Sequence, residues 1–478
     1  MAIDLAALKA LLPLIVLAAS AVAVMLLAAF SRGAAVASAT TLAGLLLAFV
    51  AVAAAIPSAP RQVSALLTVD RYALFYWALM IASAFAVAAL CHDGFGVDAG
   101  RDGALHALLL LATLGAATLA ASSHFAAFFL GLEVLSVSLF ALIAYPVDAR
   151  RALEAAIKYL ILSGGSSAFL LFGMALVYAR AGTMEFGQIG VALAGRPLDA
   201  WGSAGLGLIV VGIGFKLAVV PFHMWIADVY EGASPPVAAF VATVSKGAVV
   251  ALLMRYFVAT GAYRSTMVTL ALTLVAVASI LAGNLLALLQ DNVKRILGYS
   301  SVAHLGYLLV AFLAAGALAG EAVAYYLTAY FVTMIAAFGA IGLLAHSGPA
   351  ETIADYRALF WRRPWTAAVF AAALLSLAGI PLTMGFIAKF YVVAVGAGAG
   401  LWVPLFALVI GSTIGLFYYL RIIAAMAATQ NVRALPGAAV ASLAAGGTLA
   451  VLTLLQVWLG IYSAPLLRLL EATVARLH

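Results

Sequence analysis

The chain of 478 residues is poor in charge and has a single cysteine. Only 9% of its residues are charged, whereas 67% are hydrophobic, and its mean hydropathy is +1.20. Soluble domains average about 25% charged residues. The lone Cys91 excludes an internal disulfide. These scarcities exclude a soluble globular enzyme and indicate a polytopic membrane protein.

Sequence motifs for common cofactors are also absent. No Gly-x-Gly-x-x-Gly follows a strand, no P-loop lysine motif occurs, and no Cys/His grouping has zinc, iron–sulfur or c-type haem spacing. The net charge of +7 is spread over short loops and is not gathered with aromatic residues in one patch. We therefore expect no redox cofactor in this polypeptide and no nucleic-acid partner.

Long apolar runs fill most of the chain. At about 20 apolar residues per span, we predict an all-α integral membrane protein, one domain over residues 1–478, with about 14 transmembrane helices. The first run lacks a basic start and a cleavage site, so it is expected to be retained. The predicted spans lie near 9–30, 34–56, 71–91, 104–122, 125–146, 153–179, 201–230, 237–258, 266–289, 298–316, 321–346, 365–396, 401–425 and 437–463.

Basic residues are distributed unequally between the two sets of loops. The richer set holds Arg32, Arg101, Arg150, Arg151, Lys294, Arg295, Arg357, Arg362, Arg363 and Arg433. The poorer set, on the side of the termini, holds Lys9, Arg61, Arg180, Arg196, Arg264, Arg468 and Arg476. Because basic loops favour the negative side of a membrane, we expect a bacterial inner-membrane protein with both termini on the positive, periplasmic side.

Two predicted spans contain proline near a lysine. Pro221 follows Lys216 in the seventh span, and Pro381 precedes Lys389 in the twelfth. Proline frees backbone groups that lipid cannot satisfy, so broken helices belong where protein or water lines a cavity. Paired broken helices are typical of inverted repeats. We predict two inverted five-helix repeats, spans 4–8 over about 104–258 and spans 9–13 over about 266–425.

Ionisable side chains occur inside the predicted spans. Four of the six lysines, Lys158, Lys216, Lys246 and Lys389, lie in stretches apolar enough to cross a bilayer, as does Glu133. A charge at the membrane centre costs roughly 2.5–3.5 kcal/mol or more and usually marks an ion path. A buried lysine also gives up its proton more readily than an arginine. The pattern predicts a proton conductor.

Three of the candidates have simpler explanations beside the functional one. Lys158 lies four residues after Glu154, an order that supports a helix by ion pairing alone. His304 titrates near neutrality and is a candidate relay, although a satisfied core histidine is the alternative. The hydroxyls of Tyr299–Ser301 are able to hold water in a proton wire, but a hydroxyl bonded to its own helix is commoner.

Two segments carry a resemblance to a known family. Pro221–Phe240, which reads PFHMWIADVYEGASPPVAAF, and Gln290–Tyr307, which reads QDNVKRILGYSSVAHLGY, resemble the antiporter-like membrane subunits of respiratory complex I, with wording closest to the N-type branch. The resemblance covers essentially the whole chain. Ala227 and Ser234 differ from the residues usual in the family at these positions. Both lie in the loop after the first break and not at the charged residues.

The resemblance implies a proton channel in the membrane arm of NADH:quinone oxidoreductase. Its proton relay would be Glu133, Lys158, Lys216, Lys246, His304 and Lys389. It further implies that FMN, iron–sulfur clusters, NADH and quinone are bound by partner subunits. The expected neighbours are another antiporter-like subunit, small helical subunits and the lipid bilayer.

Two alternatives remain open at the level of sequence. Mrp-type cation/proton antiporter subunits share the second motif, and such a subunit would use the same residues without redox coupling. A scaffold bundle with vestigial charges is the third possibility, and it would tolerate neutral substitutions at the charged positions.

Overall fold

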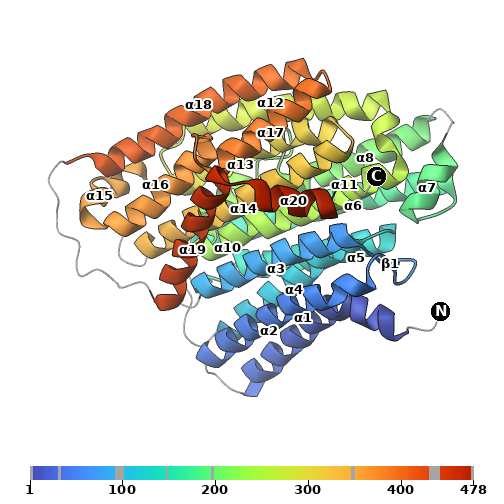
Figure 1. Ribbon diagram of the computed structural model, residues 1–478, viewed down its shortest axis with the longest axis horizontal. Coiled ribbons are helices and arrows are strands. Elements are labelled where there is room, and N and C mark those ends of the chain that lie inside the picture. The colour runs from blue at the N-terminus through green and yellow to red at the C-terminus, as the bar shows by residue number, and fades with distance from the viewer. Residues whose placement is uncertain are drawn as a thin grey trace.

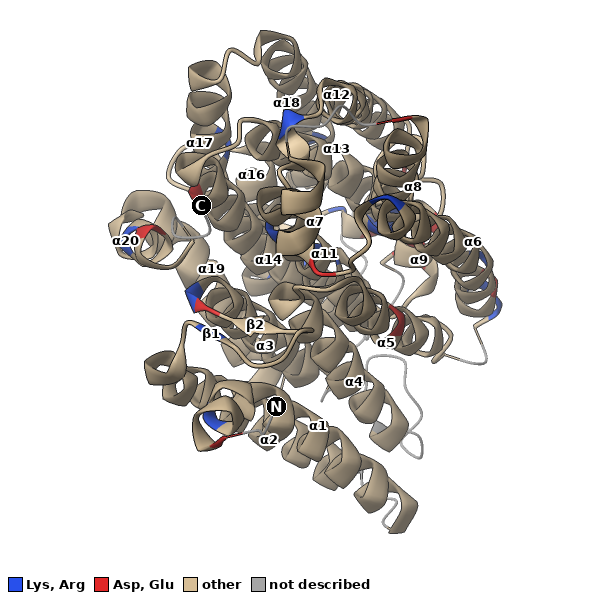
Figure 2. Ribbon diagram, turned by 90° about the vertical axis from the view of Figure 1, so that its right-hand side faces the viewer, with Lys and Arg blue, Asp and Glu red and all other residues tan. Residues whose placement is uncertain are grey.

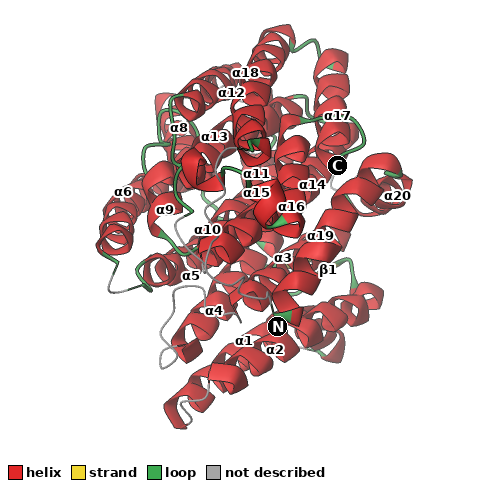
Figure 3. Ribbon diagram, turned by 90° about the vertical axis from the view of Figure 1, so that its left-hand side faces the viewer, coloured by secondary structure: helices red, strands yellow, loops and turns green. Residues whose placement is uncertain are grey.

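The protein is a bundle of helices, described by a computed structural model over residues 4–30, 34–91, 102–146, 149–194, 199–345, 350–429 and 442–474. Helices make up nearly all of it and most run roughly parallel (Figures 1 and 3). The helices are α1 (Leu5–Phe30), α2 (Ala34–Ala55), α3 (Arg71–Cys91), α4 (Asp102–Ala121), α5 (Phe125–Ile143), α6 (Arg150–Ala181), α7 (Phe186–Leu193), α8 (Ala200–Leu217), α9 (Ile226–Gly232), α10 (Pro235–Phe240), α11 (Lys246–Thr260), α12 (Thr266–Leu288), α13 (Val293–Leu313), α14 (Ala317–Ala345), α15 (Leu359–Arg362), α16 (Pro364–Ala378), α17 (Met384–Gly398), α18 (Trp402–Ala427), α19 (Leu443–Ile461) and α20 (Ala464–Thr473).

Thirteen helical stretches of the described residues are long and apolar enough to cross a membrane. They follow the predicted spans in order. The predicted twelfth span, 365–396, is divided into two shorter apolar helices, α16 and α17. Counting that pair as one broken span confirms the expected all-α multi-pass membrane fold. The two inverted repeats stay a prediction.

Charged residues are sparse on the ribbon (Figure 2). Several of the basic loop residues used to orient the chain lie outside the described residues, namely Arg32, Arg101, Arg196, Arg433 and Arg476. The periplasmic placement of the termini therefore also stays a prediction.

The first broken helix is interrupted where the sequence predicts. α8 ends at Leu217, and Ala218 turns the chain out of the helix with φ 58°. A left-handed non-glycine residue costs of order 1–3 kcal/mol and is found mainly at functional sites. The Val220 N–H beyond the turn donates to Ser279 Oγ of α12 at 2.9 Å. A neighbouring helix thus supplies the hydrogen bond that this backbone amide could not form with lipid.

The second break is built in a similar way. α16 ends at Ala378, and Gly379 leaves the helix with φ 82°. The Gly385 N–H at the start of α17 donates to Ser376 Oγ of α16 at 3.2 Å. At both breaks, therefore, a residue with left-handed backbone ends the helix. A serine hydroxyl then accepts a hydrogen bond from a backbone amide that the break has freed.

Some short elements were not predicted from the sequence. A small antiparallel hairpin pairs β1 (Arg61–Gln62) with β2 (Thr68–Val69), and α7 lies between the sixth and seventh spans. The short helix α20 follows the last span and buries Leu466 and Leu470. None of these is apolar and long enough to cross a bilayer, so a span-length criterion does not detect them.

A buried ion pair ties the first helices to the centre of the bundle. Arg255 of α11 is only 7% exposed and makes two hydrogen bonds to Asp70, at 2.8 and 2.7 Å, just before α3. Its Nε donates to the Ala120 carbonyl at the end of α4 at 3.0 Å. The guanidinium also lies 5.0 Å from the centre of the Tyr72 ring. One arginine therefore holds α3, α4 and α11 together.

We expect Asp70→Asn to lower the melting temperature of the purified protein in detergent. Removing one partner of a buried ion pair leaves an uncompensated charge and costs about 3–5 kcal/mol. The control is Asp4→Asn, because Asp4 pairs with Arg61 at a largely exposed site, where a pair contributes about 0–1 kcal/mol. Equal melting temperatures for the two variants would contradict the role of Arg255.

Candidate functional site

Lys216 lies in the last turn of α8, directly before the first break, and is 4% exposed. Its ammonium donates to Ser136 Oγ of α5 at 2.7 Å and to Ser163 Oγ of α6 at 2.5 Å. No carboxylate forms an ion pair with it among the described residues. Two neutral hydroxyls therefore take the place of water around this cation.

Glu133 is less buried than its place inside a predicted span suggests. It is half-buried on α5, and its carboxylate accepts a hydrogen bond from Ser167 of α6 at 2.6 Å. Ser136 and Ser163, which hold Lys216, lie about one helical turn from Glu133 and Ser167 respectively. The carboxylate and the ammonium thus lie at the same α5–α6 interface, each bonded to serines about one turn apart.

Lys158 is not one of the buried lysines. Its side chain is 46% exposed on α6 and pairs with Glu154 at 2.7 Å and Asp228 at 2.8 Å. Lys158 and Ser167, the partner of Glu133, are nine positions apart on α6, which is roughly 13 Å along the helix axis. The sequence could not show that Lys158 is exposed. Because α6 has apolar residues around most of its circumference, its exposed and buried faces have a similar composition.

Lys246 begins α11 directly after a π-helical turn at Val241–Ser245 and is 1% exposed. Such turns are rare and are found often at functional sites. The Lys246 ammonium donates to Ser301 Oγ of α13 and lies 5.8 Å from the centre of the Tyr230 ring. Its surroundings are again hydroxyls and an aromatic face.

His304 lies within α13 and is 5% exposed. Its Nδ1 is hydrogen-bonded to Tyr326 Oη of α14 at 2.7 Å, and its Nε2 to Tyr419 Oη of α18 at 3.3 Å. Tyr419 in turn is hydrogen-bonded to Ser300. The histidine therefore links three helices of the second half through tyrosine hydroxyls.

Lys389 of α17 lies at the second break and is half-buried. Its ammonium donates to the Ala378 carbonyl, the last of α16, at 2.8 Å and to Ser412 Oγ of α18 at 2.9 Å. It also lies 5.4 Å from the centre of the Tyr307 ring. A carbonyl freed by the break thus becomes a ligand of the lysine, which explains why the break and the cation lie together.

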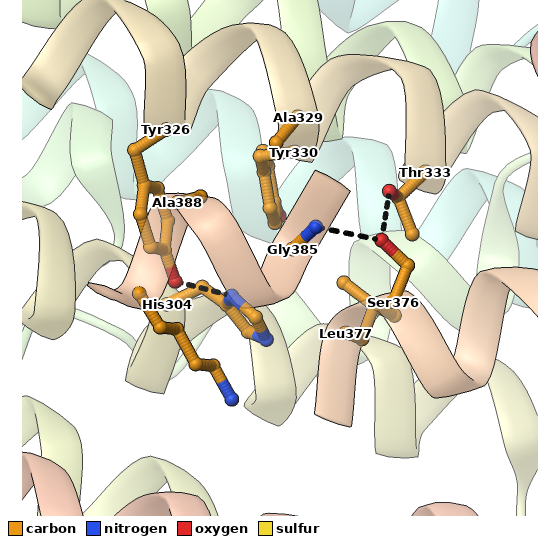
Figure 4. A pocket seen from close by; sticks show the side chains of 10 residues that line it. His304, Tyr326, Ala329, Tyr330, Thr333, Ser376, Leu377, Gly385 and Ala388 are labelled. Atoms are coloured by element: carbon orange, nitrogen blue, oxygen red, sulfur yellow. Dashed lines mark hydrogen bonds between the residues drawn. The ribbon is translucent and has the colours of Figure 1, made fainter. Parts of the chain in front are cut away.

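A small cavity is lined by both His304 and Lys389. Figure 4 shows side chains that surround it. Its volume is about 10 Å³, close to the minimum for one water molecule. Thr333 and Ser376 are hydrogen-bonded across it at 3.1 Å. Its lining residues are His304, Tyr326, Ala329, Tyr330, Thr333, Ser376, Leu377, Gly385, Ala388 and Lys389.

The hydroxyl partners of the lysines were not identified from the sequence. For Ser300 and Ser301 the sequence favours a bond to their own helix, but they contact Tyr419 and Lys246 instead. Ser136 and Ser412 carried no signal at all, because serines are frequent in membrane helices and their partners come from distant segments. Only the three-dimensional packing reveals which hydroxyls face a cation.

No metal centre is formed by the part of the chain that the structure describes. It contains no group of three His, Cys, Asp or Glu side chains close enough to hold a metal ion. The site consists instead of ammonium, imidazole and hydroxyl groups. Such groups bind and release protons.

The comparisons with known proteins show the family to which the chain belongs. Residues 122–415 match the family model described as NADH:quinone oxidoreductase/Mrp antiporter, TM. NADH-quinone oxidoreductase subunit N of Nitrosospira multiformis is 57% identical over 96% of this chain and 94% of its own length. A chain of respiratory complex I from Thermus thermophilus is 31% identical with a TM-score of 0.82, over 96% of this chain and 100% of that one. A chain of the Mrp complex from a Dietzia species is 22% identical with a TM-score of 0.87, over 98% and 97%, which shows a shared fold alone.

We expect Gly385→Ala to disrupt the second break. A Cβ at Gly385 would lie 1.9 Å from the Ser376 carbonyl oxygen, so α16 and α17 would have to separate. Overpacking of this kind costs about 1–3 kcal/mol. The matched control is Gly398→Ala on the same helix, where a Cβ meets nothing within 4 Å. A melting curve of the purified protein should show destabilisation for Gly385→Ala only, and unchanged stability in both variants would refute the close contact.

Proposed function

Because the chain belongs to the family of NADH-quinone oxidoreductase subunit N, we propose that Lys216, Lys246, His304 and Lys389 form the path by which it translocates protons. The chain is a subunit of the proton-translocating membrane arm of respiratory complex I, a multi-pass membrane protein of bacteria. Which of its residues carry the protons is the proposal.

The observation that carries the proposal is the neutrality of the lysines' partners. Lys216, Lys246 and Lys389 are held by hydroxyls or a carbonyl, whereas the buried Arg255 is held by Asp70. A cation that is paired with a buried carboxylate cannot lose its charge without stranding that carboxylate. A lysine held by hydroxyls can release its proton and keep its hydrogen bonds, because a neutral amine is also an acceptor. The three lysines therefore suit reversible protonation.

We place Glu133 at the start of the path. Quinone reduction elsewhere in the complex would change charge or hydration at one end of the subunit and shift this carboxylate between Ser167 and Lys216. The serines that hold Glu133 and Lys216 lie about one helical turn apart on α5 and α6. The approach of the carboxylate would hold a proton on Lys216, and its withdrawal would release that proton towards Lys246, His304 and Lys389. Lys216 would be refilled from the negative side of the membrane.

Lys158 is assigned a different part in this scheme. It lies on the exposed face of α6 with Glu154, within a helix that is long and apolar enough to cross the membrane. A charged pair that faced lipid would be costly, so we propose that a neighbouring complex I subunit covers this face. Lys158 would influence Glu133 from that interface. The candidate neighbours are another antiporter-like subunit and the small helical subunits.

The redox cofactors belong to partner subunits in this proposal. FMN, iron–sulfur clusters, NADH and quinone would be bound outside this chain, whose described residues offer no cluster of metal-binding side chains. The path described above involves only protons. The alternative of an Mrp-type antiporter subunit is supported by the shared fold, but the identity of 57% to a subunit N favours redox coupling.

The test is Lys216→Ala in the intact complex, reconstituted into vesicles. Without an ammonium between Ser136 and Ser163, we expect fewer protons pumped per NADH oxidised, with normal assembly of the complex. The control is Lys9→Ala, because Lys9 lies exposed on α1 away from the path. A normal pumping ratio in Lys216→Ala would refute the path, and it would favour a scaffold that tolerates neutral substitutions.

A further inference from the structure

We propose that Ser301 and Tyr330 carry the proton from Lys246 into the cavity beside Lys389. The inference rests on the function proposed above and specifies how its two halves are joined. His304 is not the direct neighbour of Lys246 among the described contacts, since its two ring nitrogens are bonded to Tyr326 and Tyr419. The link between Lys246 and the cavity therefore runs through other side chains.

Four helices bring their polar groups together at Ser301. The fully buried Ser301 Oγ of α13 is contacted by the Lys246 ammonium of α11, by Tyr330 Oη of α14 at 2.7 Å and by Tyr230 Oη of α9 at 3.2 Å. Many buried hydroxyls of this protein bond the carbonyl four residues earlier, as Thr243 does. Ser301 instead has all of its described partners on other helices.

The number of partners constrains the orientation of the hydroxyls. A serine hydroxyl accepts at most two hydrogen bonds and donates one. When the Lys246 ammonium donates to Ser301, only one of the two tyrosines can donate to it as well, so the other accepts the Ser301 proton. Tyr330 is the nearer of the two at 2.7 Å, against 3.2 Å for Tyr230. In the structure the Tyr330 hydroxyl donates to Ser301. Rotation of both hydroxyls reverses this bond, and a bond from Ser301 to Tyr330 is then oriented for transfer away from Lys246.

Tyr330 reaches the cavity that Lys389 also lines (Figure 4). Tyr330 therefore contacts Ser301 through its hydroxyl and also lines the cavity. Tyr230 does not line this cavity. The path from Lys246 to the second half is thus Ser301, then Tyr330, then one water molecule in the cavity, which His304 also lines, then Lys389.

The transfer balances without any other reactant. One N–H bond of the Lys246 ammonium breaks as its proton joins Ser301 Oγ, the Ser301 proton passes to Tyr330 Oη, and the Tyr330 proton passes to the water. The water gives a proton to the neutral amine of Lys389. Lys246 ends as an amine and Lys389 as an ammonium, and both hydroxyls return to their first orientation by rotation.

The test compares Ser301→Ala and Tyr330→Phe with Lys246→Ala in the intact complex, by protons pumped per NADH oxidised in vesicles. We expect both hydroxyl variants to lose as much pumping as Lys246→Ala does, and Ser301→Thr, which keeps a hydroxyl, to restore it. Tyr230→Phe is the matched comparison. It removes the other tyrosine hydroxyl that contacts Ser301, and this hydroxyl is not on the proposed path. It should keep the normal ratio.

The outcomes separate this inference from the function on which it rests. Normal pumping in Tyr330→Phe, or loss in Tyr230→Phe alone, overturns the hydroxyl path even when Lys246→Ala loses pumping. Normal pumping in Lys246→Ala overturns the proposed function itself. Tyr330→Phe keeps the aromatic ring and its packing, so it decides the question if Ser301→Ala fails to assemble.

Discussion

A polar group inside the hydrocarbon of a membrane finds no water, so protein must supply each of its hydrogen bonds. Much of the architecture follows from this constraint. The two broken helices free backbone groups, and serines of neighbouring segments or the Lys389 ammonium bind them. The buried lysines likewise need acceptors, which are serine hydroxyls from other helices. The breaks, the cations and the hydroxyls are therefore one structural unit rather than separate features.

The kind of partner decides whether a buried cation is fixed or able to release its proton. Arg255 is held by the Asp70 carboxylate and ties three helices together. Lys216 and Lys246 are held by neutral hydroxyls, which serve an ammonium and an amine equally well. The chain thus has a permanently charged arginine, which stabilises the fold, and lysines that can lose and regain a proton during turnover.

The sequence predicted those features that depend on local composition. The spans, the breaks at Pro221 and Pro381 and the lysines beside them follow from hydropathy and proline chemistry, and the structure confirms the breaks. The ligands of the lysines could not be predicted, because Ser163 is 53 positions from Lys216 and Ser301 is 55 from Lys246. Nor could the exposure of Lys158, since its helix is apolar on most sides and only the packing of neighbouring helices decides which face is covered.

The account depends on lysines that release their protons, not merely on positive charge at these positions. Replacing Lys389 by arginine tests this most directly, because arginine keeps the charge and donates hydrogen bonds but does not lose its proton in a protein. The account predicts that the assembled Lys389→Arg complex oxidises NADH but pumps fewer protons for each NADH. A normal pumping ratio would contradict it, because a fixed charge would then be sufficient.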